Sequence, residues 1–258
     1  LKLKDQSAAR PLMPARSNGH LELVRFTTKV VASKRRRENG RTCTDKEAYM
    51  VESSAPITAF FDVGGVIVNS HPSAQHIASL IGDGRQSLVN FVDQAMWAHR
   101  DGYDAGASDR EFWDRVAGDC GKPAVTDELL ETLVEYDSMR VHQPVPETIE
   151  LLKDLHAQGI RLGILSNAPR PIANEIRRTQ WAKYFESFTF SCDTACCKPD
   201  RPIYRAALEA MGIEAKEAVF FDDRKKNIRA AELLGIRGIM WTNAELARRD
   251  LIDLGMLA

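Results

Sequence analysis

The chain has 258 residues, 44% of them hydrophobic, and a formal net charge of −1. A chain of this length can bury a sizeable core in one large domain or in one domain with an insert. No uncharged apolar run approaches 18 residues, so we expect no membrane-spanning helix and no membrane partner. Residues 1–49 carry 12 Lys/Arg against 5 Asp/Glu, a net of +7, and the remainder carries 23 against 31, a net of −8. Because the main part of the chain is mildly acidic, we expect no nucleic-acid partner.

Residues 1–49 differ in composition from the rest of the chain. They are rich in Ser, Thr, Asn and Gly, include Lys34-Arg35-Arg36-Arg37 and have few periodic apolar positions. A nucleic-acid tail or a targeting segment is one interpretation. The composition favours a disordered basic extension, or sequence upstream of a true start at Met50. The five cysteines include no CxxC pair, which favours reduced thiols and a cytoplasmic protein over a zinc site.

From residue 56 onward, strand and helix patterns alternate along the chain. A short apolar run predicts a strand at 58–61, and helical periodicity follows at 74–81, 86–99, 109–117 and 126–137. The order then is helix 146–158, strand 161–165, helix 171–183, strand 188–191, helix 202–211, strand 218–221, helix 227–234 and strand 238–241. This alternation predicts an α/β fold, a Rossmann-like parallel sheet with helices on both faces. We assign the core to residues 50–70 and 141–258, and an inserted α-helical cap to residues 71–140.

Three of the predicted strands end in polar side chains. Asp62 follows the first strand, Ser166-Asn167 follows the second, and Asp222-Asp223 follows the fourth. The carboxyl ends of parallel strands near a topological switch form a binding crevice, so these side chains are expected to lie together, with Lys198 beside them. Clustered carboxylates repel one another unless a cation compensates, and Mg²⁺ prefers such oxygen ligands. The set fits phosphoryl transfer, in which Asp62 attacks phosphorus while Ser166 and Lys198 hold the phosphoryl oxygens.

The segment from about residue 56 to the C-terminus resembles the haloacid dehalogenase-like hydrolases. Four motifs in order carry the resemblance: Phe60-Phe61-Asp62-Val63-Gly64-Gly65-Val66, Leu165-Ser166-Asn167, Lys198-Pro199, and Phe221-Asp222-Asp223 followed by Asn227. The resemblance implies Asp62 as nucleophile, with Ser166 and Lys198 as the other catalytic residues. It implies a magnesium site in which Asp223 is the direct ligand and Asp222 the indirect one, completed by Asp62 and the backbone carbonyl of Gly64. Substrate binding is expected at Gly64, Gly65, Ser166, Asn167 and Lys198.

Gly64 departs from the pattern of most phosphatases of this family, which have a second Asp there as the general acid. Glycine cannot transfer a proton, and a general acid is worth about 10²–10⁴-fold. A branch resembling glucose-1-phosphate phosphatases also carries Gly at this position. The loss matters less when the leaving group departs easily, as an anomeric or acyl oxygen does.

Within the predicted cap, Trp97 and Arg100 are three residues apart on one helical face and are candidates for substrate contact. The alternative is that Trp97, like Trp113, belongs to the core of the cap, and that Arg100 only pairs with Asp101 or Asp104.

The sequence therefore predicts a Mg²⁺-dependent phosphatase that hydrolyses a small phosphorylated metabolite, with a sugar phosphate as one option, as a monomer or homodimer. One alternative is a 2-haloacid dehalogenase, which needs no general acid and no metal. The acidic pair Asp222-Asp223 argues against it, since that family is expected to have neutral residues there. The other alternative is a non-catalytic phosphate-binding or regulatory protein, against which the retained Asp62 argues.

Overall fold

The computed structural model describes residues 57–69 and 72–258, all within the unit Val51–Ala258. The predicted extension of residues 1–49 lies outside the described residues, as does part of the predicted segment 50–70. Among the helices of the described residues, none is both long enough and apolar enough to cross a membrane.

A five-stranded parallel sheet forms the centre of the fold. Its strands are β1 (Thr58–Phe61), β2 (Arg161–Ser166), β3 (Ser187–Phe190), β4 (Ala218–Asp222) and β5 (Arg237–Met240), in the order β3-β2-β1-β4-β5. In the central strand, Phe61 lies beside Ile164 of β2 and Phe221 of β4. The chain builds the sheet outward from β1 in one direction and then in the other, which creates a switch point between β1 and β4. The sheet confirms the predicted α/β fold.

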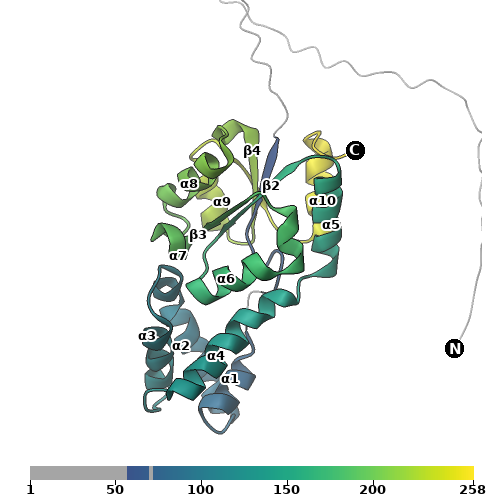
Figure 1. The fold of residues 1–258 in the computed structure, drawn as a ribbon. Helices are drawn as coiled ribbons and strands as arrows, with labels where there is room; N and C mark the ends of the chain where they lie inside the picture. The colour runs from purple at the N-terminus through teal and green to yellow at the C-terminus, as the bar shows by residue number, and fades with distance from the viewer. Residues whose placement is uncertain (1–56, 70–71) are drawn as a thin grey trace, which may run out of the picture. The chain divides into compact units, whose positions relative to one another are not determined.

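Helices cover both faces of this sheet (Figure 1). Alternate strand residues point to opposite faces. Phe61 packs with α5 (Pro146–Ala157), α6 (Arg170–Arg178) and α10 (Ala244–Asp253). Its neighbour Phe60 packs on the other face with α8 (Arg201–Met211) and α9 (Lys225–Glu232). The central strands β1 and β4 are buried on both faces and need apolar side chains at nearly every position, which explains their apolar runs.

Four helices between β1 and β2 form a group with its own core, which we call the helical insert. They are α1 (Ala74–Ile81), α2 (Gln86–Asp104), α3 (Asp109–Asp119) and α4 (Asp127–Met139). Trp113 and Phe112 are buried among them, and Tyr103 stacks on Phe112 with ring centroids 4.2 Å apart. Figure 1 shows the insert beyond the edge at which the strands end.

Two predicted helices end at other residues in the structure, and one helix was not predicted. Helix α2 continues past the predicted end at residue 99 to Asp104, which adds Arg100 and Asp104 to the helix. The helix predicted at 171–183 ends at Arg178, where Thr179 is extended and caps a separate 3₁₀ turn, η2 (Gln180–Tyr184). Helix α10 was not predicted, although Asn243 caps it by accepting a hydrogen bond from the amide of Leu246.

Candidate active site

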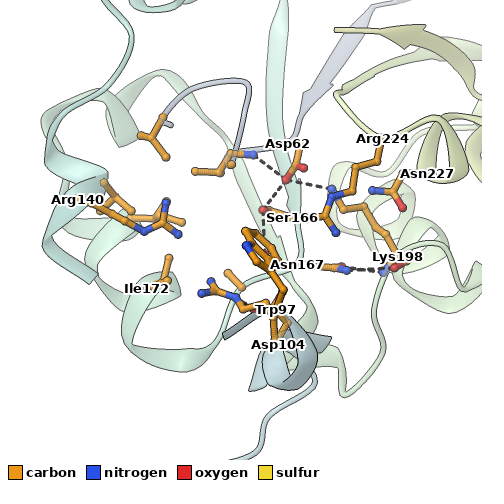
Figure 2. Close-up of a pocket in the computed structure, with 17 residues that line it drawn as sticks. Asp62, Trp97, Asp104, Arg140, Ser166, Asn167, Ile172, Lys198, Arg224 and Asn227 are labelled. Atoms are coloured by element: carbon orange, nitrogen blue, oxygen red, sulfur yellow. Dashed lines mark hydrogen bonds and ion pairs between the residues drawn. The ribbon is translucent and has the colours of Figure 1, made fainter. Parts of the chain in front are cut away.

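Asp62 lies directly after β1 and is buried, with 7% of its surface exposed. Its Oδ1 accepts hydrogen bonds from the amide of Val63 at 2.7 Å and from Ser166 Oγ at 2.6 Å. The same oxygen lies 3.0 Å from Lys198 Nζ. Among the described residues none donates a hydrogen bond to Oδ2. Three donors therefore fix the orientation of the carboxylate and leave Oδ2 for reaction with an incoming group (Figure 2).

Lys198 is held by contacts from two strands and a loop. Its Nζ donates to Leu165 O at 3.0 Å and to Asp222 Oδ2 at 2.6 Å, and Asp62 Oδ1 is its third acceptor. The side chain of Asn167 fixes the backbone of Lys198 in both directions, since Oδ1 accepts from its amide at 2.7 Å and Nδ2 donates to its carbonyl at 3.0 Å. Asn167 thus positions the lysine, in addition to lining the pocket.

The two carboxylates after β4 have different surroundings. Asp222 is fully buried and accepts hydrogen bonds from Lys198, from the amide of Arg224 and, through both oxygens, from Asn227 Nδ2. Asp223, in contrast, has a buried Oδ1 without a hydrogen-bond partner among the described residues. The protein therefore satisfies Asp222 but leaves an acceptor on Asp223.

These carboxylates fit a divalent cation. Asp62, Asp222 and Asp223 each place an oxygen within 4.8 Å of the others. A cation would satisfy the unpartnered Oδ1 of Asp223 and offset the repulsion among the carboxylates. At Gly65, which has φ +79°, a Cβ would overlap the carboxylate of Asp223, with its Cγ only 2.8 Å away. Glycine at this position lets the carboxylate approach the loop after β1.

One pocket brings most of the predicted site residues together. Asp62, Gly64, Ser166, Asn167 and Lys198 line it from the core side, and Trp97 and Arg100 line it from helix α2. Gly65 was expected to bind substrate, but it does not line this pocket because it packs against Asp223.

Other pocket residues were not assigned a role from the sequence: Asp104, Arg140 and Arg224. Arg224 is exposed and also lines the pocket, with its guanidinium carbon 5.8 Å from the centroid of the Trp97 ring. The two tryptophans of the predicted cap differ in position, since Trp113 is buried in the insert core and Trp97 lines the pocket. Arg100 pairs with Asp104, as one alternative held, and it also reaches Asp137.

Burial and mutual repulsion shape the electrostatics of the site. Burial raises the pKa of Asp222 to about 6, the charge of Asp62 adds to the rise, and Lys198 opposes it. Burial and the charge of Asp62 also raise the pKa of Asp223. Burial acts to lower the pKa of Lys198, but Asp62 and Asp222 outweigh it, so that pKa is raised. The site thus holds a charged lysine beside an acidic pair, Asp222 and Asp223, whose pKa values are raised.

We predict that magnesium stabilises the protein more at pH 7.5 than at pH 5. An unfolded Asp loses its proton near pH 4, whereas the metal-free folded protein retains the proton of Asp222 up to about pH 6. Between these values the metal-free folded state binds more protons than the unfolded chain, so its stability falls as pH rises. Magnesium must displace these protons at pH 5, and it therefore stabilises the protein less there. At pH 7.5, with free Mg²⁺ at about 100 times its Kd, we expect magnesium to raise the free energy of unfolding by roughly 2.7 kcal/mol. This corresponds to a rise in Tm of about 5–10 °C.

Thermal melts with and without Mg²⁺ at the two pH values measure this effect. Asp223→Asn should lose the magnesium increment, while Asp253→Asn, at the exposed end of α10, should keep it. Equal increments at pH 5 and pH 7.5 would contradict the assignment of the cation to these carboxylates.

Comparison with known proteins identifies the family. A sequence profile of the haloacid dehalogenase-like hydrolases matches residues 58–235, which include the sheet strands up to β4 and every residue of the site described above. The chain belongs to the haloacid dehalogenase-like hydrolases, as the motifs of the sequence predicted. The protein is therefore a hydrolase.

Individual relatives are distant. The sesquiterpene phosphatase astK of Aspergillus oryzae is 23% identical over 188 residues, 72% of this chain and 90% of that protein. A phosphorylated carbohydrates phosphatase of Thermotoga maritima is 29% identical over 161 residues, 50% of this chain and 74% of that protein. The crystal structure of a family enzyme from Bacteroides thetaiotaomicron, in complex with magnesium and inorganic phosphate, has a TM-score of 0.53 and 21% identity and covers 72% of this chain and 93% of its own. The relatives include phosphatases that differ in substrate.

Proposed function

We propose that this protein is a Mg²⁺-dependent phosphatase that hydrolyses a small phosphorylated metabolite through an aspartyl-phosphate on Asp62. The observation that carries the proposal is the arrangement around Asp62, where Ser166 Oγ and Lys198 Nζ hold one carboxylate oxygen and leave the other unbonded. The acidic pair beside it and the phosphatases among the relatives support the same reaction. A sugar phosphate is the substrate we favour, because a phosphatase of phosphorylated carbohydrates is among those relatives.

In the proposed reaction Oδ2 of Asp62 forms a bond to phosphorus, and the bond from phosphorus to the leaving oxygen breaks, with the electron pair staying on that oxygen. In this proposal Ser166 and Lys198 exchange their contacts to Asp62 Oδ1 for hydrogen bonds to the phosphoryl oxygens as the charge on those atoms increases. Water then attacks phosphorus, the bond to Asp62 breaks and inorganic phosphate is released. Asp62, Asp223 and the carbonyl of Gly64 would hold magnesium, which when bound neutralises phosphoryl oxygens.

We predict that the rate depends steeply on the pKa of the leaving group. Gly64 cannot protonate the departing oxygen, so acyl and anomeric sugar phosphates should react faster than simple alkyl phosphates by about one order of magnitude or more. Gly64→Asp should flatten this dependence if the added carboxylate is tolerated beside Asp62. Gly64→Asn is the matched control, since it adds a similar side chain without an acid. A flat dependence in the wild type, with chemistry shown to limit the rate, would contradict the absence of a general acid.

One set of assays separates the proposed function from its alternatives. Magnesium-dependent hydrolysis of p-nitrophenyl phosphate and acetyl phosphate, without action on chloroacetate, supports the phosphatase. Release of chloride from chloroacetate without added metal would indicate a dehalogenase instead. Binding of phosphate without turnover of any substrate would indicate a regulatory protein.

A further inference from the structure

The helical insert and the residue that follows it supply a charged wall to the pocket, made of Arg100, Asp104, Asp137 and Arg140. Arg100 Nε donates to Asp104 Oδ1 at 2.8 Å, and its Nη1 lies 3.3 Å from Asp137 Oδ2. Arg140 Nε donates to Asp137 Oδ1 at 3.1 Å, and its Nη1 donates to Asn69 O at 2.7 Å. Asp137 is only 2% exposed, so one buried carboxylate bridges the two arginines. Figure 2 shows Arg140 across the pocket from Lys198.

Three of the four side chains of the wall line the pocket. Arg100, Asp104 and Arg140 line it, whereas Asp137 is not among the residues that line it and contacts both guanidinium groups. Each guanidinium uses Nε and Nη1 in the wall, and neither Nη2 makes a hydrogen bond with a described residue. Asp104 likewise uses only Oδ1. Two donors and one acceptor are therefore left for a ligand, a combination that matches hydroxyl groups, which both donate and accept.

The side chains around the pocket supply no excess positive charge that could bind a second anion. The carboxylates of the site and the wall exceed the cationic side chains by one: Asp62, Asp104, Asp137, Asp222 and Asp223 against Arg100, Arg140, Lys198 and Arg224. A magnesium ion and a phosphoryl dianion cancel each other, so the balance stays negative when both are bound. A buried charge without a partner is costly, so a leaving group with its own negative charge is disfavoured.

We propose that the substrate's leaving group is uncharged and carries hydroxyl groups that Arg100, Asp104 and Arg140 bind. Asp137 is the positioning residue that holds the two guanidinium groups in place and neutralises one of them. Trp97 lines the same pocket and adds an aromatic surface for the carbon skeleton of such a group. This inference rests on the proposed phosphatase function and specifies its substrate class.

Two substrates that differ by one charge test the inference. Glucose 1-phosphate and glucuronic acid 1-phosphate differ only in a hydroxymethyl group replaced by a carboxylate, and p-nitrophenyl phosphate reports phosphatase activity independently of the wall. Burial raises the pKa of Asp104, while Arg100 opposes the rise, so kcat/KM is measured at pH 8, because a higher pH favours the ionised form of this carboxylate. We expect the wild type to prefer the neutral substrate by about tenfold or more, since unfavourable charge juxtaposition costs at least that much.

Asp137→Asn removes one negative charge at nearly constant size, so it should shift the preference toward the carboxylate substrate by about tenfold or more. Asp104→Asn should shift it in the same direction and serves if the first variant does not fold. Asp101 is exposed on α2, the helix that carries Asp104, and Asp101→Asn should leave the preference unchanged. The inference is overturned if the wild type prefers the carboxylate substrate, or if the folded variants slow both substrates equally. Absence of magnesium-dependent activity on p-nitrophenyl phosphate would instead refute the proposed function.

Discussion

Replacing Asp62 by Asn is expected to lower turnover by about 10⁴-fold or more while the protein stays folded. The amide keeps the shape of the carboxylate but lacks the charged oxygen that attacks phosphorus, and removing a covalent nucleophile costs about this much in other hydrolases. Asn can still accept from Ser166 and from the amide of Val63 through its remaining oxygen. The loss should therefore appear in kcat, with the Tm close to that of the wild type.

The measurement combines steady-state kinetics with a test of covalent chemistry. Beryllofluoride, which mimics an aspartyl-phosphate, should stabilise the wild type in the presence of Mg²⁺ and should have no effect on Asp62→Asn. Asp62→Ala serves as a second variant because it removes the side-chain oxygens altogether. Full activity in either variant would end the proposal that Asp62 is the nucleophile.

The part of the site that lies on strand ends could be predicted from the sequence. Asp62, Ser166 and Asp222 each follow an apolar run, and the carboxyl ends of parallel strands meet at one edge. The structure places the carboxylates of Asp62 and Asp222 against Lys198, and Ser166 Oγ donates to Asp62. The prediction needed only the local pattern and one rule of topology.

The charged wall could not be predicted, because it depends on how helices pack against one another. Arg100 and Asp137 are 37 residues apart in the sequence and meet only because α2 and α4 pack in the same insert. Asp104 lies beyond Gly102, a residue that disfavours helix and made the end of α2 hard to predict. Arg224 follows the acidic pair in a run of basic residues, a pattern typical of a solvated surface.

Asn167 shows the same limit of prediction from sequence, because its predicted role and its observed contacts differ. The sequence identified it as a substrate-binding residue from its place after β2. Its amide group makes two hydrogen bonds to the backbone of Lys198, and this pairing depends on a loop 31 residues away. Whether Asn167 also contacts substrate stays a prediction.

Replacing Lys198 by Met should have the second largest effect and should reduce both activity and stability. Lys198 is 2% exposed, and its ammonium group lies between Asp62 and Asp222 at 3.0 and 2.6 Å. Without it, two buried carboxylates lose their common partner, and breaking a buried pair in this way costs about 3–5 kcal/mol. Activity should fall by about 10²–10³-fold, the effect of removing one donor to the charge of the transition state.

The pH dependence of this variant distinguishes lost electrostatics from lost packing. Lys198 opposes the rise in the pKa of Asp222, so its removal raises that pKa further. The folded variant then binds a proton that the unfolded chain has released, and its stability must increase as the pH is lowered from 8 to 6. Lys226→Met, at an exposed position of α9, removes the same charge without a buried partner and should match the wild type. Melting curves across this pH range decide the question, because a packing defect would lower Tm equally at every pH, whereas uncompensated carboxylates lower it most at pH 8.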